Sequence, residues 1–207
     1  MESRESIDID VSVKIVLVGD SQVGKSSLLS LFINEEFNQN IPTTHGIGNK
    51  HRTLELEGKV VKVDLWDVPG HIKYRPALTQ FYNHASAAIL IFDLSKRESF
   101  KNLNKWISEL TLSGIKLPRI LLVGNKSDKT EERDIDESDL QNFLKNYYLK
   151  YIETSAKTGE NVEEAFMIAL QKSLKFYEGR NESRSSTQVD ARNREACCVC
   201  RVVCRLF

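Results

Sequence analysis

Short apolar runs alternate with polar segments along the first part of the chain. Val11 to Val18 (VSVKIVLV) is rich in β-branched residues, which favours a strand. Residues 26–32 (SSLLSLF) carry apolar side chains at helical spacing, so a glycine-containing loop joins a strand to a helix. Residues 33–49 are mostly polar, contain two glycines and Pro42, and have no sustained period. They predict a long exposed loop.

A hairpin is predicted next. Two runs with strand character, His51 to Leu56 and Val60 to Trp66, flank Glu57, Gly58 and Lys59. A connection this short that contains glycine joins antiparallel neighbours.

The second part of the chain alternates buried strands with amphipathic helices. Residues 87–93 (AAILIFD) and 119–125 (RILLVGN) are continuous apolar runs, typical of strands buried on both faces. Between them, residues 99–112 carry apolar side chains at helical spacing. A helix, a short strand and a last amphipathic helix follow at residues 139–147, 151–154 and 162–177.

The predicted fold is therefore α/β, in three layers. We expect a mostly parallel six-stranded sheet with one antiparallel edge strand and helices on both faces. Residues 1–10 form an N-terminal extension and residues 11–178 the folded domain. Residues 178–196 contain almost no apolar side chains, which predicts a disordered tail over residues 179–207.

Composition narrows the classes of function. Lys plus Arg equals Asp plus Glu at 29 each, so overall charge gives no reason to expect a nucleic-acid partner. No apolar stretch approaches the roughly 18 residues that a transmembrane helix needs, and the N-terminus MESRESIDID does not resemble a signal peptide. The four cysteines all lie at the C-terminal end, so no disulfide framework is expected. We expect a cytoplasmic protein.

The loop after the first strand carries a phosphate-binding motif. GDSQVGKS, residues 19–26, fits G-x-x-x-x-G-K-[ST] between a strand and a helix. Gly24 lets the main chain curl, Lys25 reaches the β and γ phosphates, and Ser26 offers its hydroxyl to Mg²⁺. A chance glycine-rich turn is the alternative, and the strand-to-helix context disfavours it. The residues expected around the phosphates are Ser21, Gln22, Val23, Gly24, Lys25, Ser26 and Ser27.

Two further segments follow buried strands and point to guanine. Residues 125–128 (NKSD) and 155–157 (SAK) lie at the carboxyl ends of strands, where open α/β sheets bind ligands. The Asp128 carboxylate can accept hydrogen bonds from the N1–H and N2–H₂ groups of guanine, a donor pair that adenine lacks. The residues expected at the base are Asn125, Lys126, Asp128, Ser155, Ala156 and Lys157.

Five motifs in this order resemble the small GTPases of the Ras superfamily, most closely the Rab family. They are GDSQVGKS, the segment around Thr44, WDVPG, NKSD and ETSAK. The resemblance implies a P-loop GTPase fold, with Phe37 packed against guanine and Lys126 over its ring. It also implies that Ser26 and Thr44 bind Mg²⁺, that Asp67 holds the ion through water, and that the Gly70 N–H bonds the γ phosphate.

His71 follows Gly70, where Rab proteins normally have glutamine. Neutral imidazole donates at one nitrogen and accepts at the other, across a wider span than a carboxamide. We hypothesise slow intrinsic hydrolysis, with His71 orienting the attacking water only when an activating partner positions it. An exposed switch residue without a catalytic role is the alternative. The candidate catalytic residues are His71, Lys25, Thr44 and Gly70.

The C-terminus, CCVCRVVCRLF, offers lipidation sites. The last four residues fit a C-a-a-X box that begins at Cys204 and ends in Phe207, which favours geranylgeranyl. Cys197, Cys198 and Cys200 are candidates for palmitoylation, and two lipid signals give stable anchoring. A reactive thiol cluster and a Cys₄ zinc site are the alternatives.

Together these features predict a GTP-hydrolysing switch that regulates vesicle traffic, the traffic role coming from the resemblance alone. The expected partners are guanine nucleotide, effectors, an exchange factor, a GTPase-activating protein and, through the lipidated tail, the cytosolic face of a membrane. A Ras-like signalling GTPase and a GTP-loaded scaffold with negligible hydrolysis are alternatives. A P-loop kinase is disfavoured, because NKSD favours guanine.

Overall fold

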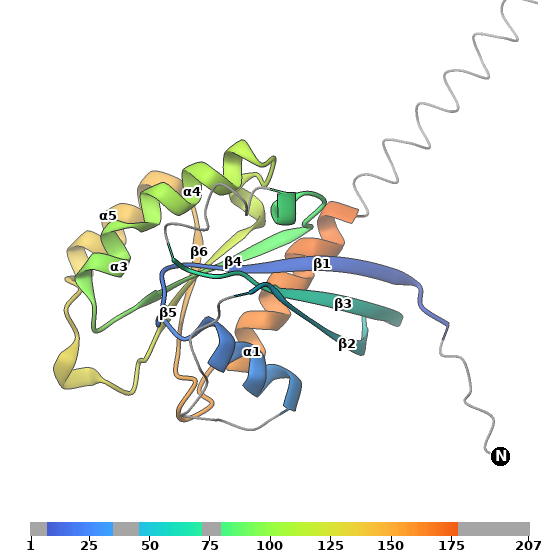
Figure 1. Cartoon of the computed structure of the whole chain (residues 1–207), viewed down its shortest axis with the longest axis horizontal. Coiled ribbons are helices and arrows are strands. Elements are labelled where there is room, and N and C mark those ends of the chain that lie inside the picture. The colour runs from blue at the N-terminus through green and yellow to red at the C-terminus, as the bar shows by residue number, and fades with distance from the viewer. Residues whose placement is uncertain (1–7, 35–45, 72–79, 178–207) are drawn as a thin grey trace, which may run out of the picture. The chain divides into compact units, whose positions relative to one another are not determined.

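The structure, a computed structural model, describes residues 8–34, 46–71 and 80–177 and contains a mixed sheet (Figure 1). Within these residues the sheet has six strands in the order β2-β3-β1-β4-β5-β6. The strands are β1 (Val11–Val18), β2 (Gly48–Leu56), β3 (Lys59–Asp67), β4 (Ala87–Asp93), β5 (Ile120–Asn125) and β6 (Lys150–Thr154). Neighbours pair in parallel except β2 and β3, which are antiparallel. The predicted sheet is confirmed.

Helices cover both faces of this sheet (Figure 1). One face carries α1 (Lys25–Asn34) and the helix that begins at residue 162, joined by a stack of Phe32 on Phe166 with ring centroids 4.1 Å apart. The other face carries α3 (Arg97–Lys101), α4 (Leu103–Leu112) and α5 (Glu137–Tyr147). Short 3-10 turns lie at Leu117–Arg119 and Thr130–Glu132.

Burial explains why the central strands have no alternating pattern. Every residue of β4 and of β5 is buried, because helices cover both faces of these strands. The core on the α4 side includes Leu90 and Leu122 from the sheet and Trp106, Leu110 and Phe143 from the helices. The continuous apolar runs in the sequence therefore correspond to strands inside the sheet.

The long loop predicted for residues 33–49 is wrong at both ends. Helix α1 extends to Asn34, and β2 already begins at Gly48. The start of β2 is polar and exposed, because β2 is an edge strand that gains its structure from pairing with β3 rather than from burial. The predicted turn is confirmed: Glu57 and Gly58 have φ of 54° and 73°, which matches a two-residue type I′ hairpin.

The single helix predicted for residues 99–112 is also divided. Helix α3 ends at Lys101 and α4 begins at Leu103, with Asn102 between them. The main-chain carbonyl of Asn102 accepts from the N–H groups of both Lys105 and Trp106, so the chain tightens here without leaving the helical path. The spacing of the apolar residues does not predict this tightened turn, because it stays helical across Asn102.

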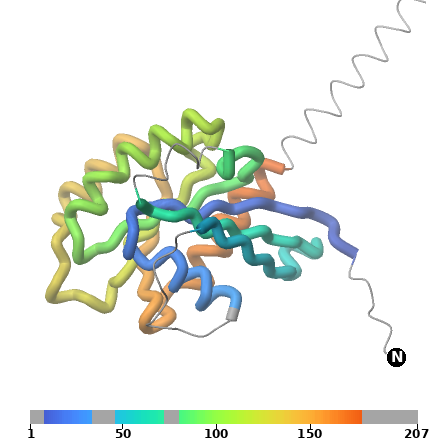
Figure 2. The backbone as a smooth tube through the Cα atoms, viewed as in Figure 1, coloured from blue at the N-terminus to red at the C-terminus, as the bar shows by residue number. Residues whose placement is uncertain are grey.

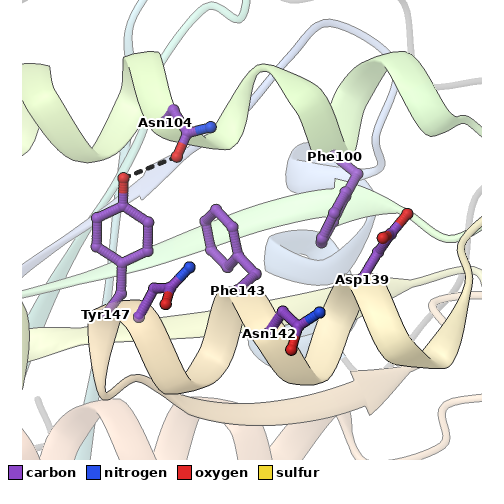
Figure 3. Close-up of a pocket in the computed structure, with 7 residues that line it drawn as sticks. Phe100, Asn104, Asp139, Asn142, Phe143 and Tyr147 are labelled. Atoms are coloured by element: carbon purple, nitrogen blue, oxygen red, sulfur yellow. Dashed lines mark hydrogen bonds between the residues drawn. The ribbon is translucent and has the colours of Figure 1, made fainter.

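Aromatic side chains join α3 and α4 to α5, around a surface groove (Figure 3). Phe143 lies 5.3 Å from Phe100 and 4.8 Å from Tyr147 between ring centroids. The Tyr147 hydroxyl donates to Asn104 Oδ1 at 2.7 Å. This groove contains none of the residues expected at the nucleotide.

Candidate nucleotide site

The parallel strands end at one edge of the sheet, and the sequence motifs follow those ends. The chain leaves β1 at this edge, passes through residues 19–24 and turns back into α1 (Figure 2). Gly24 has φ of +98°, and a Cβ added there would lie 2.2 Å from Asn125 Nδ2. Only glycine fits this position, because both the backbone angle and the space exclude a side chain.

Lys25 is buried at the first turn of α1, with 6% of its surface exposed. Its ammonium group donates to the main-chain oxygens of Gly19 at 3.0 Å and Asp20 at 2.7 Å. Burial lowers the pKa of Lys25 to about 8, and the opposing influence of Asp67 and Asp20 only partly offsets it. A phosphate at this position would favour the charged form.

Asn125 is the side chain on which three strand-end loops converge. It ends β5 and is 1% exposed. Its Nδ2 donates to the main-chain oxygen of Val23 at 2.8 Å. Its Oδ1 accepts from Thr154 Oγ1 and from the Ala156 N–H, each at 3.3 Å. The first, fifth and sixth strands are thus tied together where they end.

Lys126 connects the phosphate loop to a carboxylate that the sequence motifs do not include. Its ammonium pairs with Asp93 Oδ2 at 2.7 Å and donates to the Gln22 carbonyl at 3.0 Å. Burial raises the pKa of Asp93, but hydrogen bonds from Lys126 and Ser95 outweigh this and lower it below its ordinary value. Asp93 is not among the residues that the motifs predict, although a carboxylate at the carboxyl end of a buried strand is itself a signal for this edge of the sheet.

Asp128 is oriented by the segment that follows β6. The Ser155 hydroxyl donates to Asp128 Oδ1 at 2.6 Å, and Ser155 Oγ accepts from the Thr158 N–H at 3.1 Å. Ser155 and Ala156 are buried, while Lys157 is exposed.

Gly70 lies directly against the phosphate loop. A Cβ added at Gly70 would lie 2.3 Å from the carbonyl carbon of Asp20 and 2.4 Å from the nitrogen of Ser21. His71, the next residue, is exposed. The segment after β3 therefore meets the loop after β1 through main-chain packing.

Comparison with known proteins identifies the chain. The sequence model of the Ras family matches residues 14–175. The chain belongs to the Ras family. Ras-related protein RABA4b of Arabidopsis thaliana is 35% identical over 89% of this chain and 81% of its own length. Ras-related protein Rab-11A of Dictyostelium discoideum is 40% identical over 79% and 76%. GTP-binding protein ypt1 of Schizosaccharomyces pombe is 35% identical over 86% and 88%. The chain is a Ras-superfamily GTPase of the Rab type.

The oxygen atoms of this Ras-family site suit Mg²⁺. The Ser26 hydroxyl donates to Asp67 Oδ2, and Asp67 is 5% exposed. A hydroxyl and a carboxylate are hard oxygen ligands, and Mg²⁺ binds through one or two protein groups together with substrate phosphates. No cluster of three His, Cys, Asp or Glu side chains forms a metal cage in the described parts of the chain.

Several predicted residues of this Rab-type chain lie outside the described ranges. They are Phe37, Thr44, Cys197, Cys198, Cys200 and Cys204. In the part of the chain that the structure describes, none of the helices combines the length and apolarity required to cross a bilayer.

Proposed function

We propose that this Rab-type protein binds GTP and GDP with Mg²⁺ at the carboxyl edge of its sheet, hydrolyses GTP and acts as a molecular switch. The observation that carries the proposal is the Asn125 side chain, which ties the phosphate loop at Val23 to the base segment at Ala156. A single ligand with phosphates at one end and guanine at the other would contact both segments at once. The relative named GTP-binding protein ypt1 supports the same assignment.

Each group then has a role. Lys25 and the main chain of residues 21–27 neutralise the phosphates, and the Gly70 N–H bonds the γ phosphate. Ser26 and Thr44 would ligate Mg²⁺, and Asp67 would hold it through water. When bound, the ion would offset the negative charge of the phosphates. Phe37 and Lys126 pack on guanine, Asp128 accepts from its edge, and Asn125, Ser155, Ala156 and Lys157 shape the pocket.

His71 makes the intrinsic hydrolysis slow. It is exposed and directly follows Gly70, and it orients the attacking water when an activating partner positions its side chain. This same observation favours a second candidate function, a GTP-loaded binding scaffold with negligible turnover. A Ras-like signalling role uses the same switch with different effectors.

We further propose a place for the switch. The Rab names of the relatives support a role in vesicle traffic, with effectors, an exchange factor and a GTPase-activating protein as partners. Prenylation at Cys204, with acyl chains at Cys197, Cys198 or Cys200, would hold the protein on the cytosolic face of a membrane.

The test combines nucleotide content with single-turnover kinetics. Purified protein should release mostly GDP if it hydrolyses GTP and mostly GTP if it is a scaffold. We expect His71→Gln to raise the intrinsic rate by about tenfold, equivalent to about 1.4 kcal/mol of barrier. His71→Ala should reduce the rate stimulated by an activating protein. His51→Ala, at an exposed position on β2, is the control and should change neither rate. Equal rates for wild type and His71→Ala in both assays would remove His71 from the mechanism.

A further inference from the structure

Asp20, inside the phosphate loop, is held by two side chains from the helical layer. Asn102 Nδ2 donates to Asp20 Oδ2 at 2.7 Å. Trp106 Nε1 donates to Asp20 Oδ1 at 2.8 Å. Each carboxylate oxygen therefore has its own donor, one from the junction of α3 and α4 and one from the first part of α4.

Burial and local geometry fix both donors. Trp106 is 0% exposed within the core on the α4 side, where an indole N–H requires an acceptor. Asn102 Oδ1 accepts from Lys105 Nζ at 2.9 Å, which turns the amide nitrogen toward Asp20. The division between α3 and α4 at Asn102 thus coincides with this contact. We call Asp20, Asn102 and Trp106 the loop clamp.

The residue that the loop clamp holds carries the phosphate end of the site. The Asp20 main-chain oxygen accepts from Lys25 Nζ at 2.7 Å. The peptide between Asp20 and Ser21 lies directly against Gly70. A displacement of Asp20 would therefore move an acceptor of the phosphate-binding lysine and the surface on which Gly70 rests.

We propose that Asn102 and Trp106 are positioning residues that set the lifetime of bound nucleotide by fixing the loop through the Asp20 carboxylate. This inference rests on the proposed guanine-nucleotide site and extends it to its regulation. Since the two donors belong to the helical layer, the position of the α3–α4 junction controls nucleotide release. Release accelerates when the junction and the loop separate.

The hydrogen-bond donors and acceptors can be exchanged to test the clamp. In Asp20→Asn one acceptor becomes a donor that faces another donor, and in Asn102→Asp two carboxylates face each other. In the double variant Asp20→Asn, Asn102→Asp the amide at position 20 accepts from Trp106 and donates to the carboxylate at position 102. The pairing is restored with its direction reversed.

The measurement is the dissociation rate of fluorescent GDP from the full chain in Mg²⁺. We expect each single exchange to accelerate dissociation by about tenfold or more. The double variant should return to within about threefold of wild type. Asn104→Ala is the matched control. Asn104 lies on α4 like Trp106, and its substitution removes the bond from Tyr147 on α5 without touching the clamp, so the rate should be unchanged.

A second measurement does not depend on nucleotide. The chain has two tryptophans, so the Trp106 indole N–H resonance can be assigned with Trp66→Phe. Its proton shift should change strongly in Asp20→Ala and not in Asn104→Ala.

Each negative result has its own meaning. A wild type that binds no guanine nucleotide overturns the proposed function. A wild type that binds it, with variants that dissociate at the wild-type rate, overturns the positioning role alone. An unchanged indole shift in Asp20→Ala removes the clamp itself. The dissociation rates of all variants could instead rise as their thermal stability falls, and the double variant could fail to recover. That result would overturn the positioning role and leave the clamp a purely structural contact.

Discussion

The two ends of the candidate site each contain a lysine that donates to the phosphate loop, yet they are built differently. At the phosphate end, Lys25 is almost fully buried and donates to two main-chain oxygens. At the base end, Lys126 is partly exposed and pairs with the buried Asp93 carboxylate. The first end depends on main-chain geometry and the second on side-chain pairs.

Because of this difference, the two ends should tolerate substitutions differently. The Asn125 side chain lies so close to the Gly24 main chain that no space is left for a methyl group, so we expect the phosphate end to fail when an atom is added. The base end is held by separate contacts of Asp93, Asn125 and Ser155. The loss of one of these hydrogen bonds should therefore weaken it only in part. We therefore expect the phosphate end to depend on a fixed main-chain loop and the base end to depend on several independent polar contacts.

The largest effect is expected from Gly24→Ala. An alanine would be strained at the backbone φ of +98°, and its methyl group would collide with Asn125 Nδ2 and break the bond from Asn125 to the Val23 carbonyl. We expect a loss of about 3 kcal/mol in the free energy of unfolding and loss of measurable GDP binding. Urea unfolding and equilibrium binding of fluorescent GDP measure the two quantities.

Gly114→Ala is the matched control for this substitution. Gly114 has φ of +88°, and no atom lies within 4 Å of its would-be Cβ, so only backbone strain is introduced. We expect the free energy of unfolding to fall by about 1 to 2 kcal/mol and GDP binding to stay normal. Equal losses in the two variants would show that close packing at Gly24 adds nothing.

A smaller effect is expected from Asp93→Asn at the base end. The neutral amide removes the charge partner of Lys126 but keeps the shape of the side chain. We expect unfolding free energy to fall by about 1 to 2 kcal/mol and GDP affinity by about tenfold, because Lys126 is partly solvated. Asp136→Asn, which weakens an exposed pair with Arg97, is the control and should leave GDP affinity unchanged. If both variants bind GDP equally well, the Asp93 pair does not order the base end.

The smallest effect concerns Glu153 on β6, which supports the strand leading into the base segment. Burial raises the pKa of Glu153, but hydrogen bonds from Arg133 and Tyr151 outweigh it and lower the pKa below its ordinary value. The ionised form is therefore favoured by folding, so its stabilisation exists above the unfolded pKa near 4.5 and is lost as pH falls.

Glu153→Gln tests this sign. The variant should be less stable than wild type by up to about 1 kcal/mol at neutral pH, and the gap should close below about pH 4.5. Urea unfolding across this pH range measures the gap. Glu163→Gln, in a more exposed pair with Arg52, should show a smaller one. A gap that widens with acidification contradicts the assigned direction of the shift.

Local pattern predicted most of the fold but not its irregular points. The continuous apolar runs gave β4 and β5, since burial on both faces leaves a direct trace in the sequence. The polar start of β2 was missed because an edge strand takes its structure from a neighbour. Asn102 was missed because its tightened turn keeps the helical spacing of apolar residues intact.

The candidate site divides in the same way. The sequence by itself determined which segments carry phosphate and base chemistry, because those motifs are short and contiguous. Only the tertiary structure decided that Asp93 pairs with Lys126 and that Asp20 receives Asn102 and Trp106, partners 82 and 86 residues away. The reason is the strand order, in which β1 lies beside β4 and brings the loop after β1 next to the helices that follow β4. A contact between distant segments leaves no periodic pattern in the sequence, so only the folded structure shows it.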